Sequence, residues 1–554
     1  MIRQEIIKLI QKATGETEEK IQVERPENEV YGDYSTNIAL QLKKDPKEIA
    51  DKLKSDIFER VEVKNGFINF WISENKLKDL FSEVADKGVR IFQNKIKERG
   101  TIVIEYSSPN IAKPLGVHHL GSTVIGQALV NILRFVGYKV ISLSFPGDWG
   151  TQFGLLIAAY KRWGNKEKLK ENPIGEMLDL YVRFSKDAKE NPELLKKGRD
   201  EFKKLEEGDK ENKKIWKWFL EESLKDFDRV YKLLEVKIEN TIGESFYEPE
   251  LKDFVKNAIK RGLAEKGQDG AIVISLAGSK TPEIIQKADG ATIFTTRELV
   301  AIRHRLEKWH ASKILYVAAN QQTFHFEQVF GCAEKLGIAK SNQLFHVKFG
   351  MMLAPGGKKF ATREGRLIPL EDVLKEAVRR ARKVVEELNP SLPEKKKEEI
   401  AKTVGIGALK FFVLSRNRLS DIIFDWDQML NLKGFSAPYI QYTCARLNSI
   451  LQKANFKKPK KSRITITNSL EKSIITKIIS FGETLEAIGQ DYFPNQLAEY
   501  LYNLANVVNN FYEEVPVLKA VEAERKSRLN IVHTAKEIFT TGLNLLGISA
   551  PEKM

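Results

Sequence analysis

Residues 105–126 constrain the fold of this chain more than any other segment, because they join a predicted strand to a long predicted helix. The apolar run 101–106 is typical of a buried strand, and apolar residues then recur at helical spacing over 119–136. A second strand is predicted at 139–145. A strand, tight loop, helix and strand in this order form the opening unit of a nucleotide-binding parallel sheet.

The loop within this segment has the chemistry of a phosphate site. A loop that leads into a helix N-terminus offers free backbone N–H groups and the positive end of the helix dipole. Two adjacent imidazoles, His118 and His119, lie at that junction. We expect this loop to bind ATP and stabilise charge in a transition state. An ordinary strand-to-helix turn with incidental histidines is the alternative reading.

Composition bounds the class of protein. A chain of 554 residues indicates several domains, and its formal charge of +15 indicates a polyanionic partner, although lysine-rich solvated surfaces would give the same charge. Cys332 and Cys444 have no partners at metal-binding spacing, so neither a disulfide framework nor a zinc site is expected. The sequence shows neither a signal peptide nor a membrane-spanning run, and we expect a cytoplasmic protein.

The chain divides into three predicted domains. A small α+β domain includes Asn65-Gly66, which indicates a turn into a strand, and is followed by a region of alternating strands and helices. A charged helical insertion occupies about 161–245, and from 371 onward helices dominate. The domain ranges are 1–95, 96–370 and 371–554. The strands predicted in the middle region are 101–106, 139–145, 271–275 and 314–319.

Three further groups of residues have spacing suited to ligand binding. Residues 351–365 form a glycine-rich loop that carries Lys358, Lys359 and Arg363 and is suited to clamping a triphosphate. Residues 289–298 form a turn and helix start with an acid that can pair with a cationic substrate. A basic surface loop and an ordinary capped helix are the respective alternatives.

A predicted helix after Pro438 supplies the third group. Tyr439, Tyr442 and Arg446 recur at i, i+3 and i+7 and therefore share one helix face. Base stacking and phosphate pairing fit this face, and a half-buried aromatic stripe fits it equally well.

The motifs, taken in order, resemble those of the arginyl-tRNA synthetases, a class I aminoacyl-tRNA synthetase family, over essentially the full chain. The motifs that carry the resemblance are E-x-S-S-P-N-I-A-K-P at 105–114, G-D-W-G-T-Q-F-G at 147–154, K-F-A-T-R at 359–363, Q-Y-x-x-A-R at 441–446 and the C-terminal L-L-G-I-x-x-P-E-K-M. At the N-terminus, G-D-Y-S-T-N and G-F-I-N-F resemble the domain that this family adds for tRNA contact.

The resemblance implies a multidomain α/β protein. Its expected parts are a Rossmann-type parallel-sheet catalytic domain with a helical insertion, a small N-terminal α+β domain and a C-terminal all-α bundle. The implied activity is arginine–tRNA ligation through arginyl-adenylate, with L-arginine, ATP with Mg²⁺ and the tRNA for arginine as substrates. We expect a monomer with no tightly bound protein metal.

The resemblance also assigns the ATP site. The signature His-x-Gly-His of the family falls on Gly116-Val117-His118-His119, which keeps only the second histidine. A rival frame, His119-Leu-Gly-Ser122, requires a three-residue shift against well-matched flanks. The expected catalytic residues are Lys113, His119, Lys358, Lys359 and Arg363. The expected ATP-binding residues are Gly116, His118, His119, Ser122 and Lys359.

The same carry-over gives the sites for arginine and tRNA. Phe294 and Glu298 stand where the family has tyrosine and aspartate, so a phenolic hydroxyl is lost and the acid is kept on a longer arm. The expected arginine-binding residues are Glu105, Asn110, Phe294, Glu298 and Gln322. The expected tRNA-binding residues are Phe67, Asn69, Tyr439, Tyr442 and Arg446. A class I synthetase for another amino acid and a non-catalytic tRNA-binding paralogue are the two alternative functions.

Overall fold

The computed structural model describes the whole chain except residues 1, 27, 94–98, 279–280 and 361–367 and the side chains of Glu29 and Lys359. Contacts divide the chain into two compact units. Unit 1 comprises residues 1–95, 388–396 and 430–554. Unit 2 comprises residues 96–387 and 397–429.

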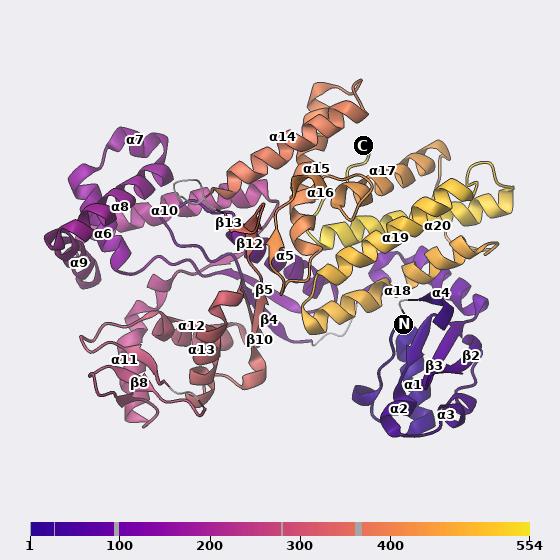
Figure 1. Cartoon of the computed structure of the whole chain (residues 1–554), viewed down its shortest axis with the longest axis horizontal. Helices are drawn as coiled ribbons and strands as arrows, with labels where there is room; N and C mark the ends of the chain where they lie inside the picture. Colours follow the sequence, from indigo (N-terminus) through magenta and orange to yellow (C-terminus); the bar gives the residue numbers. More distant parts are fainter. Residues whose placement is uncertain (1, 27, 94–98, 279–280, 361–367) are drawn as a thin grey trace. The chain divides into compact units, whose positions relative to one another are not determined.

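A five-stranded, all-parallel sheet forms the centre of unit 2 (Figure 1). Its strand order is β11-β10-β4-β5-β6. The strands are β4 (Thr101–Glu105), β5 (Lys139–Ser144), β6 (Asn240–Thr241), β10 (Ala311–Ala319) and β11 (Leu344–Phe349). The parallel sheet expected from the sequence is confirmed, and it also contains β6 and β11, which were not among the predicted strands.

The order of this sheet creates a switch point between β4 and β10. From β4 the chain moves outward through β5 and β6, and then returns to the other side of β4 as β10. The two connections leave in opposite directions, so a crevice opens at the carboxyl ends of β4 and β10, where ligands bind in such sheets. Helix α5 (His119–Phe135) begins at this crevice, close to its predicted start.

Helix α5 is held in place by the side chain of Ser122. Its hydroxyl donates to the carbonyl of Val317 in β10 at 2.7 Å and accepts from the N–H of Ser107 at 2.9 Å. These bonds join the first turn of α5 to β10 and to the loop directly after β4, the two strands at the switch point. The loop after β4 is thereby fixed where the nucleotide site was predicted.

A helical insertion follows β5, as the sequence predicted. Its helices are α6 (Thr151–Trp163), α7 (Lys166–Glu171), α8 (Pro173–Glu190), α9 (Pro192–Glu207) and α10 (Lys210–Leu233). Trp216 and Trp218 are half-buried on α10. Their neighbour Phe219 is buried, as are Phe227 and Tyr231 on the same helix.

The predicted strand 271–275 does not join the parallel sheet. Residues Ile272–Ile274 form β8, which pairs antiparallel with β7 (Glu265–Lys266) and β9 (Glu283–Gln286) in a separate three-stranded sheet. These strands are short and pair antiparallel with one another, so they form a small sheet of their own. They are not part of a connection between neighbouring strands of the parallel sheet. Local sequence gave the strand correctly, but its partners depend on the tertiary fold.

The remaining elements of unit 2 are helices and short strands outside the five-stranded sheet. The helices are α11 (Glu248–Lys260), α12 (Phe294–Trp309), α13 (Thr323–Lys335), α14 (Leu370–Leu388), α15 (Glu394–Leu414) and α16 (Trp426–Met429). The short strands are β12 (Met352–Ala354), β13 (Lys358–Lys359) and β14 (Ile422–Ile423).

Unit 1 contains an N-terminal antiparallel sheet with the order β1-β3-β2. Asn65 and Gly66 both have positive φ, at 51° and 82°, and turn β2 directly into β3. Glycine and asparagine tolerate this conformation, which matches the twist of a hairpin, so the predicted turn is confirmed. The elements are α1 (Ile2–Thr14), β1 (Tyr34–Thr36), α2 (Ile38–Leu42), α3 (Pro46–Lys52), β2 (Phe58–Lys64), β3 (Phe67–Ile72) and α4 (Glu74–Lys87).

Four long helices make up the C-terminal part of unit 1 (Figure 1). They are α17 (Ala437–Lys453), α18 (Ser469–Asp491), α19 (Asn495–Glu514) and α20 (Glu522–Leu545). The all-α bundle expected from the sequence is confirmed. None of the helices in the described part of the chain combines the length and apolarity needed to cross a membrane.

Candidate functional site

The loop before α5 fixes the state of His119. The backbone N–H of Gly116 donates to Nδ1 of His119 at 3.1 Å, so that nitrogen is an acceptor without a proton. Burial, and then the neighbouring His118 ring, lower the pKa of His119 to about 3. The imidazole is therefore neutral at pH 7, and its proton lies on Nε2, where it can be donated to a phosphate oxygen.

Backbone hydrogen bonds also join the same loop to residues 368–370. Val117 N–H donates to the carbonyl of Ile368 at 3.1 Å, and Leu370 N–H donates to the carbonyl of Leu115 at 2.7 Å. These two bonds join the loop before α5 to residues 368–370, which follow the predicted glycine-rich loop 351–365 in sequence. Residues 361–367 are not described. Arg363 lies in that stretch, outside the described residues.

A cavity of about 300 Å³ lies beside the start of α5. The exposed ring of His118 reaches it, and so does the backbone at Gly121, where an added Cβ would lie 2.8 Å from Phe349. Glycine is required there because a side chain would collide with the ring of Phe349, which also lines the cavity. The cavity is lined by His118, Gly121, Ile125, Ala319, Gln321, Phe349, Gly350, Met351, Met352, Leu353, Phe360, Val413, Arg418 and Ile422.

The lysines of the glycine-rich loop lie on a short hairpin next to this cavity. Strand β13 pairs antiparallel with β12 through the turn at Gly356 and Gly357, which both have positive φ. Lys358 is exposed on β13, and the side chain of Lys359 is outside the described part of the structure. The hairpin therefore places the backbone of both lysines beside residues that line the cavity.

The structure places Lys113 outside the lining of the cavity beside α5. Its ammonium lies 5.1 Å from the ring centre of Tyr181 in the helical insertion. Lys113 and Asn110 together line a separate cavity of about 190 Å³. Ser122 is also engaged within the protein by the two bonds described above, so its expected contact with ATP would compete with them.

Two buried carboxyl groups meet one buried guanidinium at the carboxyl end of β4. Glu105 and Glu298 are 8% and 2% exposed, and Arg305 is fully buried. Nη1 of Arg305 lies 2.6 Å from Oε2 of Glu105. Burial raises the pKa of Glu298 well above its ordinary value, and the nearby Glu105 raises it further, against the effect of Arg305. Oε2 of Glu298 has no hydrogen-bond partner among the described residues.

A third carboxyl group, Glu244, lies near Asn110. A Cβ on Gly147 would stand 2.1 Å from Oδ1 of Asn110 and 3.2 Å from Oε1 of Glu244, so glycine is required where these side chains approach the backbone. Burial raises the pKa of Glu244 to about 7, although Arg297 at 3.4 Å opposes the shift. This part of the site therefore carries excess acid, which suits a cationic substrate.

Phe294 and Gln322, also predicted to contact arginine, are on the exposed side. Phe294 is 40% exposed, and its ring lies 6.4 Å from that of Phe145 and 5.1 Å from that of His325. Gln322 is exposed at the end of the short turn after β10. The structure brings Glu105 and Glu298 together through Arg305 and leaves these two residues at the surface.

The N-terminal sheet forms a pocket of about 370 Å³ around Phe67 and Asn69. Phe67 is 42% exposed, Asn69 is buried, and the ammonium of Lys64 lies 4.8 Å from the ring centre of Tyr31 at the same pocket. An exposed aromatic face, a buried amide and a nearby cation suit a nucleobase with its phosphate. The structure thus brings the two predicted residues of this domain into one pocket.

The helical bundle forms a groove of about 860 Å³ at the predicted face of α17. The guanidinium of Arg446 lies between the rings of Tyr442 and Tyr512, at 4.9 Å and 4.4 Å from their centres. Tyr439, in contrast, donates its hydroxyl to Asn506 at 2.8 Å and does not line the groove. Two of the three residues predicted on this face therefore remain available to a ligand.

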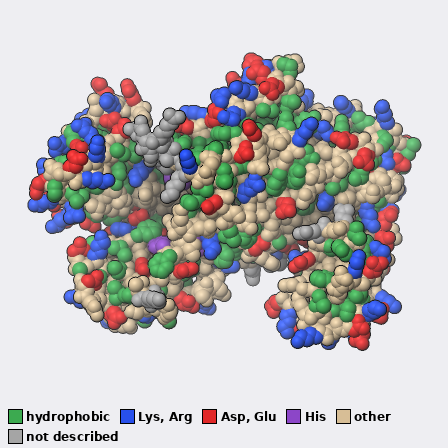
Figure 2. Space-filling view, viewed as in Figure 1, with side chains coloured by type: hydrophobic (Ala, Val, Ile, Leu, Met, Phe, Trp, Pro, Cys, Tyr) green, Lys and Arg blue, Asp and Glu red, His purple; other side chains and the backbone are tan. Residues whose placement is uncertain are grey.

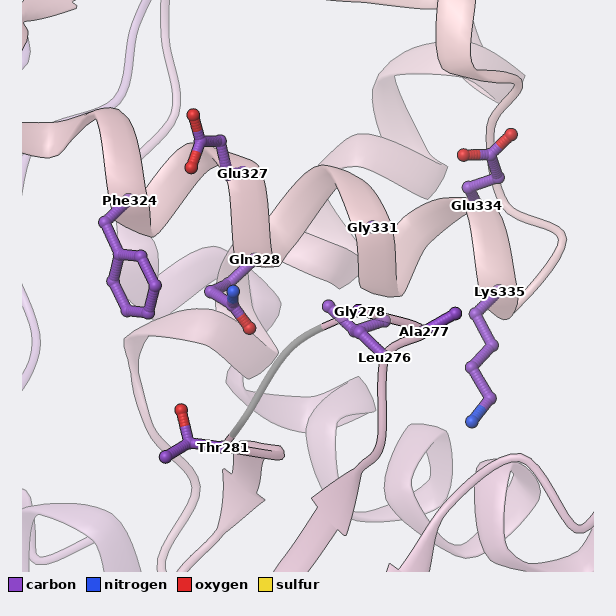
Figure 3. A pocket seen from close by; sticks show the side chains of 10 residues that line it. All are labelled: Leu276, Ala277, Gly278, Thr281, Phe324, Glu327, Gln328, Gly331, Glu334 and Lys335. Carbon is purple, nitrogen blue, oxygen red and sulfur yellow. The ribbon is translucent and has the colours of Figure 1, made fainter.

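A further cavity of about 770 Å³ lies between α13 and the loop after β8 (Figure 3). Glu327, Gln328 and Glu334 of α13 border it, and none of the predicted site residues does. It is separate from the chemistry described above.

Three residues of these sites escaped the sequence reading: Glu244, Arg305 and Tyr512. Arg305 follows Glu298 by seven residues on α12, a spacing that places both on one helix face and could have identified it. Glu244 and Tyr512 reach their sites only through the fold, and no local spacing indicates them.

Comparison with known proteins shows the family to which this chain belongs. The family model described as tRNA synthetases class I (R), catalytic domain, matches residues 81–426, which is more than half of the chain. The chain belongs to the arginyl-tRNA synthetase family. The arginyl tRNA synthetase N terminal domain matches residues 1–72 of this synthetase, and the DALR anticodon binding domain matches residues 440–554.

Individual relatives of this synthetase cover nearly the whole chain. It is 40% identical over 545 residues to Arginine--tRNA ligase 1 of Bacillus cereus, which covers 96% of this chain and 95% of that protein. It is 38% identical over 540 residues to the Arginine--tRNA ligase of Enterococcus faecalis, with the same coverage. The arginyl-tRNA synthetase structure from Plasmodium falciparum superposes with a TM-score of 0.84 at 26% identity and covers 100% of this chain and 98% of that one. The Thermus thermophilus structure, at 23% identity and a TM-score of 0.87, covers 100% of both chains and shows the same fold.

Proposed function

We propose that this synthetase uses ATP to attach L-arginine to its tRNA through an arginyl-adenylate. The observation that carries the proposal is the buried Glu298 carboxyl group, which has an oxygen without a hydrogen-bond partner among the described residues. Such a group costs free energy in the free protein, and a substrate guanidinium would satisfy it. Residues 96–370 would carry out this chemistry.

The ATP side of the reaction would use the loop before α5. The adenine would enter the cavity beside Gly121, and the phosphates would lie at the helix N-terminus, as helix dipoles favour. Nε2–H of His119 would donate to an oxygen of the α-phosphate as negative charge develops there. Lys358, Lys359 and Arg363 would balance the charge of the pyrophosphate.

The reaction would proceed in two transfers without a covalent enzyme intermediate. A carboxylate oxygen of arginine attacks the α-phosphorus of ATP, and pyrophosphate leaves with its Mg²⁺. A ribose hydroxyl of the terminal tRNA adenosine then attacks the arginyl carbonyl carbon, and AMP leaves. Mg²⁺ would enter bound to ATP as part of this substrate. The protein would contribute positioning and charge stabilisation.

Discrimination for arginine would come from pairing its planar cation with Glu298. A carboxylate accepts two parallel N–H groups from a guanidinium, whereas an ammonium such as that of lysine presents a point charge. Phe294 provides an apolar face in place of a hydroxyl donor. The acid at position 298 is thus the main determinant of specificity in this proposal.

The tRNA would contact residues 1–95 and 371–554. The pocket at Phe67 and Asn69 would take one nucleobase, and the groove at Tyr442 and Arg446 would take bases and phosphates of the anticodon. Basic and acidic side chains are interspersed over the face in Figure 2, and the net charge of +15 favours a polyanion overall.

Aminoacylation of total tRNA, tested with each of the twenty amino acids, examines the proposal directly. Charging with arginine alone is expected, and pyrophosphate exchange with tRNA present should respond to arginine and not to lysine. Charging with another amino acid would identify a synthetase of different specificity. Tight tRNA binding without any charging would identify a non-catalytic paralogue, which the replaced signature residues Gly116 and His118 make worth testing.

A further inference from the structure

We propose that the cavity of about 770 Å³ between α13 and the loop after β8 is a second cation site, which binds a small molecule with a planar guanidinium group. The proposal goes beyond the ligase activity, because none of the residues assigned to ATP, arginine or tRNA lines this cavity. Four side chains of α13 carry it, namely Phe324, Glu327, Gln328 and Glu334.

Gln328 gives the cavity a buried hydrogen-bond acceptor that the protein does not satisfy. The residue is 8% exposed, and its Oε1 has no hydrogen-bond partner among the described residues. Figure 3 shows the amide extending from α13 toward the loop that carries Thr281. A buried acceptor without a donor destabilises the protein, so a ligand N–H group at this position is favoured.

An aromatic face lies next to this acceptor. Phe324 precedes Gln328 by four residues on α13, so the two side chains are neighbours on one helix face. Phe324 lines the cavity and is 63% exposed, and its ring contacts no other aromatic ring in the described part of the chain. A guanidinium can stack its flat face on such a ring and donate from its edge to the amide oxygen.

The charges around the cavity select a cation over a phosphate. Glu327 and Glu334 border the cavity two helical turns apart, are exposed, and form no ion pair with any described residue. Among the described lining residues only Lys335 is basic, and its ammonium donates to the carbonyl of Ser275 at 2.6 Å. The two carboxylates therefore attract an organic cation and repel a nucleotide or a tRNA phosphate.

Agmatine is a probe with this chemistry. It carries a guanidinium at one end and an ammonium at the other, and it lacks the carboxylate through which arginine would be activated. Its guanidinium would lie against Phe324 and donate to Gln328 and Glu327. Its ammonium would lie toward Glu334, the second carboxylate along the helix.

The test is a calorimetric titration of agmatine into the full-length protein, with the substrate pocket filled by a non-hydrolysable arginyl-adenylate analogue. The analogue keeps agmatine out of that pocket, and one agmatine should still bind per chain. Gln328→Leu should weaken agmatine binding about tenfold, because the buried acceptor is lost. Phe324→Ala and Glu327→Gln should each weaken it two- to fivefold, the usual effect of losing one exposed cation–π contact or one exposed ion pair.

Gln268→Leu and Glu307→Gln are the matched controls. Both residues are exposed in unit 2 and do not line the cavity, so these variants should bind agmatine as the parent does. Gln328→Leu removes an unsatisfied acceptor, and its melting temperature should therefore not fall. If it does not fold, Phe324→Ala and Glu327→Gln decide the matter, because both residues are exposed.

Three results would overturn the proposal: no agmatine binding once the substrate pocket is filled, equal affinity in the parent and the cavity variants, or equally tight binding of 1,5-diaminopentane. The last of these would show a site for ammonium groups without selection for guanidinium. Failure of the protein to charge arginine would instead count against the proposed ligase function, and the comparison of parent and cavity variants would still decide the role of this cavity.

Discussion

The backbone N–H of Gly116 donates a hydrogen bond to Nδ1 of His119 at 3.1 Å. This bond selects the imidazole tautomer with the proton on Nε2. The donor is a backbone group, so glycine at position 116 leaves this bond in place although the histidine side chain expected there is missing.

His119→Ala should therefore lower kcat by about 10²- to 10³-fold, the usual effect of removing one donor that stabilises transition-state charge. His118→Ala is the matched comparison, because His118 lines the cavity without this hydrogen bond. It should change the KM for ATP more than kcat. Steady-state aminoacylation measures both, and equal losses of kcat in the two variants would contradict the assignment.

Glu298→Gln should raise the KM for arginine about 10- to 100-fold, since a charged hydrogen bond of about 1.5–3 kcal/mol is lost. The KM for ATP should stay nearly unchanged. An unpaired buried acid destabilises the protein without substrate. Its removal should therefore not lower the melting temperature. Arginine KM values that agree between variant and parent would remove Glu298 from the substrate pocket.

Glu244 makes stability depend on pH. Its folded-state pKa is about 7, above the ordinary value of a glutamate, so between about pH 4.5 and pH 7 the folded protein binds more protons than the unfolded chain. This contribution to the free energy of unfolding is lost as the pH rises through that window. Glu244→Gln should remove this pH-dependent loss of stability, which is on the order of 3 kcal/mol.

Urea titrations at pH 5 and pH 8 measure this effect as the difference in the free energy of unfolding between the parent and the Glu244→Gln variant. The variant should gain stability relative to the parent at pH 8 and not at pH 5. A difference that is the same at both values would show that Glu244 does not titrate in this range.

Phe67→Ala should raise the KM for tRNA about tenfold, because one base-stacking contact is worth about 1–3 kcal/mol. The ring is exposed, so the melting temperature should stay constant. Val30→Ala is the control, since Val30 is 69% exposed in the same domain and does not line the pocket. Equal tRNA KM values for both variants would exclude stacking at Phe67.

Substitutions at Tyr442 and Tyr439, on one face of α17, should have different effects: one on tRNA binding and the other on protein stability. Tyr442→Ala should raise the KM for tRNA several-fold with little change in stability. Tyr439→Phe should cost about 1 kcal/mol through its lost bond to Asn506 and leave the KM for tRNA unchanged. The reverse pattern would move the tRNA contact to Tyr439.

Local sequence determined several of the helices, strands and turns of this protein. The apolar strand at 101–105, the helix start at His119 and the Asn65-Gly66 hairpin turn follow from periodicity and backbone preference, which act over a few neighbouring residues. The motifs around these elements also indicated the family, and the order of the motifs indicated which residues to assign to ATP and to arginine.

Only the tertiary structure decided which residues meet. Strand 272–274 was predicted from its own residues, yet it pairs outside the parallel sheet, because strand pairing depends on distant segments. Arg305 and Glu105 are 200 positions apart in sequence, and their ion pair arises because α12 covers the end of β4. The energies of burial and ion pairing in this cluster depend on surroundings that several strands and a helix create together, so no local pattern could have specified them.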